Sequence, residues 1–191
     1  MRRSAMSYAI HDKQSAPEAS REVLEQAEQA YGFVPNLFGV LAESPAALRA
    51  YTAVTDILQH AGLNPVEQQV VMLTVSADNG CTYCVGAHSG LAQMVKMDPA
   101  VLEALREQRE LPDAKLEVLR RFTLAVLSHR GWVPEAELQT FHEAGYGQRE
   151  VLDVITIVAL KTLSNYTNHI AGTPLDQAFA GLEWEPARAT G

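Results

Sequence analysis

The two cysteines of this 191-residue chain lie three positions apart, at Cys81 and Cys84, and His88 follows four residues later. Asp78-Asn79-Gly80 is expected to end one helix, and the next is expected to run from residue 82 to about residue 96. Residues three, four and seven positions apart share a helix face, so both sulfurs and the imidazole lie on one side. The backbone N–H groups and the dipole at a helix start favour a thiolate. The segment predicts reactive thiols beside a titratable histidine.

This combination suits peroxide reduction. A thiolate attacks the O–O bond and becomes a sulfenic acid, which condenses with a nearby thiol to give a disulfide. His88 can take the thiol proton and return it to the leaving alkoxide near neutral pH. Zinc binding is an alternative, but zinc needs four ligands and the segment supplies three. Two buried small residues are a second alternative. We therefore expect a redox pair with no metal and no cofactor.

The helices that must position these residues follow from hydrophobic spacing and from capping residues. Residues 1–16 lack periodicity and are expected to form a loose N-terminal arm, and residues 17–191 a single all-helical domain. Nothing in the sequence indicates a strand. The helices are expected at residues 18–30, 37–42, 46–60, 66–77, 82–96, 99–107, 113–129, 134–143 and 148–170.

Composition limits the partners. The net charge of −8 and the pI near 5.2 disfavour nucleic acid and anionic membranes as ligands. No apolar run approaches the roughly 20 residues that span a bilayer. The residues after 1–6 include Ser, His, Asp and Lys where a signal peptide would be apolar, so we expect a cytoplasmic protein. Residues 66–77 and 151–163 are apolar on more than one face, which indicates central helices or helices covered by another subunit of a homo-oligomer.

The segment from PVEQQ at 65–69 through CTYC at 81–84 to His88 resembles the signature of the alkylhydroperoxidase D-like branch of the carboxymuconolactone decarboxylase family. ALKTLSNYTNH at 159–169 is similar to a C-terminal helix of its peroxidase-related members. The resemblance covers residues 64 to 174. It implies an alkylhydroperoxidase D-like helical bundle, thiol-dependent reduction of alkyl hydroperoxides, and assembly into trimers or hexamers. By position, it implies that Cys84 is oxidised, that Cys81 is its partner and that His88 belongs to a proton relay.

The chain departs from the family pattern at two positions. The relay glutamate of the family is here Gln69, and the nearest acid, Glu67, is rotated by roughly 200° around the helix. Glu67 is therefore expected to be an exposed partner of the helix dipole, with the relay as its weaker alternative. Tyr83 stands where the best-studied members have histidine, and it either packs or orients the substrate. Asn165 and His169, late in the last helix, are candidate pocket residues.

Three classes of function remain open. The first is a thiol-dependent peroxidase that takes a small hydroperoxide and an unidentified thiol or protein reductant. The second is a redox sensor or oligomeric binding protein without catalysis, and the third is a muconolactone decarboxylase, which would not need a redox pair. The attacking thiol is also open, because the helix dipole favours Cys81 whereas proximity to His88 and the family pattern favour Cys84.

Overall fold

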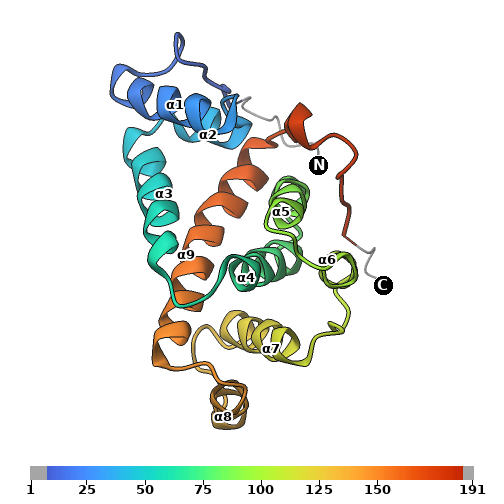
Figure 1. The fold of residues 1–191 in the computed structure, drawn as a ribbon. Helices are drawn as coiled ribbons and strands as arrows, with labels where there is room; N and C mark the ends of the chain where they lie inside the picture. The colour runs from blue at the N-terminus through green and yellow to red at the C-terminus, as the bar shows by residue number, and fades with distance from the viewer. Residues whose placement is uncertain (1–7, 187–191) are drawn as a thin grey trace, which may run out of the picture.

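The computed structural model describes residues 8–186, and within them the chain forms nine α-helices, two short 3-10 turns and no strand (Figure 1). The predicted all-α class is confirmed. In the same residues no helix is both long and apolar enough to cross a membrane. The helices are α1 (Glu18–Tyr31), α2 (Asn36–Leu41), α3 (Pro45–Ile57), α4 (Pro65–Asp78), α5 (Thr82–Met94), α6 (Pro99–Arg106), α7 (Ala114–Ser128), α8 (Glu135–Glu143) and α9 (Gln148–Ala171).

Helices α4 and α9 position the site. Figure 1 shows α9 running between α3 on one side and α4 and α5 on the other, and α4 packs against α5, α7 and α9. Residues 69–77 of α4 are all buried, which confirms that this apolar segment is a central helix. Helix α9 buries one face only, and it leaves Leu152, Ile155, Tyr166 and Ile170 exposed on the other. The hydrophobic effect thus fixes both helices against α5.

The turn before Cys81 is fixed by a glycine. Gly80 has a φ of 66° and ends α4 in the left-handed conformation. The N–H groups of Gly80 and Cys81 donate to the carbonyls of Ala77 at 3.0 Å and Ser76 at 2.8 Å. These are the two bonds of a Schellman motif. Cys81 is thereby held at the N-cap position of α5, as the sequence predicted.

Two segments outside the helices are also tied to the fold. Of the expected loose arm, residues 1–7 lie outside the described residues. Residues 8–16 are anchored, because the His11 N–H donates to the Gly39 carbonyl at 3.1 Å and Ala16 is buried. Backbone pairing of this kind leaves no periodic pattern in the sequence. At the other end, the Trp184 indole donates to the Arg106 carbonyl at 2.7 Å, so the segment after α9 lies along α6.

Candidate functional site

Cys81 and Cys84 lie at the start of α5 and are free thiols in this structure. Each is only 1% exposed. Two residues of α9 approach the sulfur of Cys84. The Asn168 side-chain amide donates to it at 3.3 Å, and the Ser164 hydroxyl oxygen lies 3.9 Å away. Cys84 is thus enclosed between α5 and α9 rather than open to solvent.

The surroundings of the two thiols shift their pKa values in opposite directions. Burial tends to raise the pKa of Cys84, but the hydrogen bond from Cys81, the positive charge of Lys161 and the amides of Asn168 and Asn165 hold that pKa well below its ordinary value. The pKa of Cys81 is raised, first by its hydrogen bond to Cys84 and then by burial. Helix-dipole reasoning alone favours Cys81 as the thiolate. The surroundings instead favour Cys84.

His88 is buried between α4 and α9 with both ring nitrogens engaged. Nδ1 lies 2.9 Å from the Gln69 side-chain oxygen, and Nε2 lies 2.7 Å from the Lys161 ammonium nitrogen. The amide oxygen accepts from Nδ1–H, which leaves Nε2 to accept from Lys161. Burial and then the charge of Lys161 lower the pKa of His88 well below its ordinary value, so the ring is neutral.

These contacts correct one expectation. His88 was expected to serve the cysteine sulfurs directly, because all three side chains share one face of α5. Within residues 8–186, however, neither ring nitrogen makes a hydrogen bond to a sulfur, and Lys161 from α9 occupies Nε2. Helical spacing determines which residues share a face. It does not determine which side chain from a neighbouring helix reaches them.

Lys161, Ser164 and Asn168 were not among the residues predicted to form the site. Lys161 is 1% exposed, and none of the ion pairs found within residues 8–186 includes it. A signal was present in the sequence: the spacing of three and seven positions places the three residues on one face of a helix whose preceding turns are apolar. A polar stripe within an apolar helix indicates a buried polar site.

The two α9 residues expected to line the pocket, Asn165 and His169, lie in different environments. Asn165 is buried, where it accepts a hydrogen bond from the Asn79 amide at 2.9 Å and lies 3.5 Å from the Ser76 hydroxyl. It therefore ties α9 to the turn that carries Cys81. His169 is exposed and stacks beside Tyr166, so the structure does not bring it to the cysteines.

Tyr83, between the cysteines, anchors the segment that follows α9. Its side chain is buried, and its hydroxyl donates to the Asp176 carboxylate at 2.6 Å and accepts from the Leu37 N–H at 3.3 Å. Burial, followed by the hydrogen bond to Asp176, raises the pKa of Tyr83, which keeps the phenol protonated. These contacts favour packing over substrate orientation for Tyr83.

Glu67 is buried, contrary to the expectation of an exposed acid, and its partners are not site residues. One carboxylate oxygen accepts from the Asn64 N–H at 2.9 Å and completes a capping box. The other accepts from the Tyr146 hydroxyl at 3.1 Å and from the Lys115 ammonium at 3.2 Å. The capping box directs the Glu67 side chain back under Tyr146 and Lys115, which explains why Glu67 is buried. The structure does not bring Glu67 to the cysteines.

Replacing Glu67 with alanine should therefore destabilise the protein without changing Cys84. The loss of the cap and an unpaired Tyr146 hydroxyl should lower the free energy of unfolding by about 1–3 kcal/mol. Urea denaturation measures that loss, and the alkylation rate of Cys84 in the folded protein measures the thiol. A slower alkylation at unchanged stability would place Glu67 in the relay after all.

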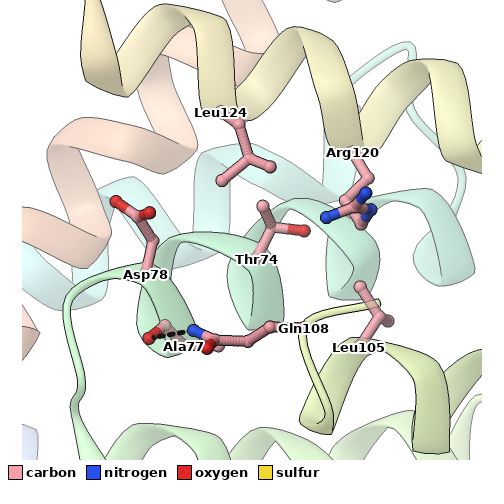
Figure 2. Close-up of a pocket in the computed structure, with 7 residues that line it drawn as sticks. All are labelled: Thr74, Ala77, Asp78, Leu105, Gln108, Arg120 and Leu124. Carbon is pink, nitrogen blue, oxygen red and sulfur yellow. Dashed lines mark hydrogen bonds between the residues drawn. The ribbon is translucent and has the colours of Figure 1, made fainter. Parts of the chain in front are cut away.

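A separate cavity of about 230 Å³ lies between α4, α6 and α7 (Figure 2). The Gln108 side chain crosses its floor and donates to the Ala77 carbonyl at 2.7 Å. The cavity contains neither a cysteine nor a histidine, and in the described residues no three His, Cys, Asp or Glu side chains gather to hold a metal. Its lining residues are Thr74, Ala77, Asp78, Leu105, Gln108, Arg120 and Leu124.

The helices form an alkylhydroperoxidase D-like helical bundle. Residues 45–127 match the profile of the carboxymuconolactone decarboxylase family. The recognition of this family from the cysteine segment is thereby confirmed. No curated protein is similar enough in sequence to count as a match.

Solved structures share the fold over nearly the whole chain. The alkylhydroperoxidase AhpD core of an uncharacterised peroxidase-related protein from Ralstonia eutropha JMP134 is 27% identical, with a TM-score of 0.80 over 90% of this chain and 93% of that one. An uncharacterised peroxidase-related protein from Silicibacter sp. TM1040 is 21% identical, with a TM-score of 0.77 over 93% and 97%. A cysteine-to-alanine variant of the debrominase Bmp8, in complex with 2,3,4-tribromopyrrole, is 16% identical, with a TM-score of 0.73 over 93% of this chain and 97% of that one. The last two show the fold alone.

Proposed function

We propose that the protein is a thiol-dependent peroxidase that reduces small organic hydroperoxides with Cys84 as the nucleophile. One observation carries this proposal: the buried Cys84 sulfur accepts the Asn168 amide and lies in the field of Lys161, and together with Cys81 these hold its pKa well below that of an ordinary thiol. A thiolate is the form that attacks the O–O bond. The family resemblance points to the same chemistry.

The proposed reaction has two steps. The Cys84 thiolate bonds to the terminal oxygen of the hydroperoxide, the O–O bond breaks, and the alkoxide leaves with a proton from the hydrogen-bonded Lys161–His88 pair. Cys84 is then a sulfenic acid and the hydroperoxide has become an alcohol. The Cys81 thiol attacks this sulfur, a disulfide forms, and the oxygen leaves as water. A dithiol or a protein thiol reduces the disulfide, becomes oxidised itself and restores both cysteines and the proton.

One unpartnered atom supports a polar ligand beside Cys84. The Asn168 side-chain oxygen is buried and has no hydrogen-bond partner within residues 8–186. A buried acceptor without a partner is costly, and the O–H of a hydroperoxide would satisfy it. Asn168 would then contact both the thiolate and the substrate. We further propose that the protein acts in the cytoplasm as a homo-oligomer, a trimer or a hexamer.

The rate of cumene hydroperoxide consumption under excess dithiothreitol tests the proposal. We expect sustained turnover well above that of a reference peptide with the sequence of residues 79–88, because the peptide lacks Lys161 and Asn168. Oxidation that occurs once and stops, or proceeds at the rate of the peptide, would contradict the peroxidase. That result would favour a redox sensor with the same cysteine pair.

A further inference from the structure

Lys161 presents an electrostatic problem. Its ammonium group is buried in the core, and within residues 8–186 it forms no ion pair with Asp or Glu. An unpaired buried charge is costly, so such a cation needs an anion nearby. Its hydrogen-bond partner His88 is neutral and cannot supply one. The remaining group of the site that can carry negative charge at this point is a cysteine.

Geometry indicates which cysteine it is. Along α9, Asn168 contacts Cys84, and two turns earlier Lys161 contacts His88. On α5, His88 lies one turn from Cys84, which is about 5.4 Å of helix. The ammonium is thus within the range over which opposite charges stabilise each other in a protein interior. Lysine carries three N–H donors and His88 takes one, so two remain for the sulfur or the substrate.

We propose that Lys161, and not His88, is the cation that holds Cys84 as a thiolate, and that His88 is the neutral acceptor that positions the Lys161 ammonium. The inference rests on the proposed role of Cys84 as the nucleophile. The family's relay glutamate is replaced here by Gln69, and we give the proton-donating role of that acid to Lys161. Gln69 then has a role of its own, because its side-chain oxygen keeps the proton of His88 on Nδ1.

The alternative, a protonated His88, conflicts with the contacts. Nε2 would then become a donor and would face the Lys161 ammonium nitrogen at 2.7 Å with no acceptor between them. Two cations at that separation repel in the low dielectric of the core. A neutral His88 with a charged Lys161 satisfies both hydrogen bonds.

The other titratable groups around Cys84 do not supply the positive charge that stabilises its thiolate. Cys81, on the same helix, has a raised pKa and donates as a neutral thiol. Tyr51 of α3 and Tyr83 of α5 are protonated, since burial raises the pKa of both. The Asp176 carboxylate, which accepts from the Tyr83 hydroxyl, is an acid and cannot supply a positive charge. Lys161 is the cation that remains.

The test is the titration of Cys84 in a Cys81→Ser background, which needs no peroxide. Thiolate absorbance and the iodoacetamide alkylation rate are followed against pH for the protein that keeps Lys161 and for Lys161→Met. The signal of a Cys84→Ser protein is subtracted as the background. We expect a midpoint below the ~8.5 of an unperturbed cysteine when Lys161 is present. Lys161→Met should raise it by about 1–3 pH units. Alkylation near neutral pH should fall about 3- to 30-fold, because less thiolate is present, and the fall is smaller than the loss of thiolate because a more basic thiolate is a better nucleophile.

Two controls keep the proposal falsifiable. Lys115→Met removes a lysine that pairs with Glu67 outside the site, and its midpoint should not move. Lys161→Arg keeps the charge and should keep the midpoint low. An unshifted midpoint in folded Lys161→Met overturns the proposal, and so does an ordinary midpoint for Cys84 with Lys161 present, even if Lys161→Met does not fold. A shifted midpoint without peroxide turnover would uphold Lys161 and reject the peroxidase.

Discussion

Replacing Cys84 with serine is expected to abolish catalytic hydroperoxide reduction, with a loss of about 10³-fold or more in the rate of the first turnover. A serine hydroxyl stays protonated in the same field that ionises the thiol, so the nucleophile disappears while the polar contacts of α9 remain. The Cys81→Ser variant should behave differently. Its first turnover should keep most of the rate, because Cys84 still attacks, and sustained turnover should fall because the sulfenic acid has lost its thiol partner.

Stopped-flow and steady-state assays on the two variants separate these effects. They are matched controls for each other, since both exchange one buried sulfur for oxygen, at the N-cap and in the first turn of α5. A rapid first turnover that survives in Cys84→Ser and disappears in Cys81→Ser would reverse the assignment. That outcome would mean that the helix dipole outweighs the contacts from α9.

The second large effect is expected at Asn168. Asn168→Asp places a carboxylate where an amide now donates to the Cys84 sulfur at 3.3 Å. A like charge this close should raise the Cys84 midpoint by about 1–3 pH units, so the fraction of thiolate near neutral pH and the peroxide rate should both fall sharply. The rate should recover as the pH is raised through the new midpoint. A pH profile of the first turnover measures both.

Gln148→Glu is the matched control for this change. It makes the same exchange of amide for carboxylate in the exposed first turn of α9, where the helix dipole tolerates a negative charge. Its pH profile should equal that of the unaltered protein. If Asn168→Asp also kept that profile, Asn168 would not contribute to the thiolate, and the ligand role of its free oxygen would lose its support.

Much of the fold could be predicted because local signals define helix ends. Asn64-Pro65 predicted the start of α4, and the structure shows a complete capping box there. Gly80 predicted the end of α4, and its positive φ places Cys81 at the next N-cap. Each signal acts within one turn of the backbone, so no knowledge of the neighbouring helices was needed.

The polar network could not be predicted in the same way, because it depends on the packing of α9 against α4 and α5. His88 shares a helix face with both cysteines, yet its partners are Gln69 and Lys161. Glu67 was expected to be exposed, and residues distant in the sequence bury it. The spacing of Lys161, Ser164 and Asn168 was the available signal. It predicts a polar face on α9, but it does not predict which helix packs against that face.

Cys84 is proposed as the thiol that peroxide oxidises, and mapping the oxidised sulfur tests this assignment. Reduced protein, Cys81→Ser and Cys84→Ser are each treated with one equivalent of cumene hydroperoxide in the presence of dimedone, digested, and analysed by mass spectrometry. We expect a disulfide between Cys81 and Cys84 in the unaltered protein and a dimedone adduct on Cys84 in Cys81→Ser. Two unmodified thiols, or an adduct that forms on Cys81 in Cys84→Ser at an equal rate, would contradict it.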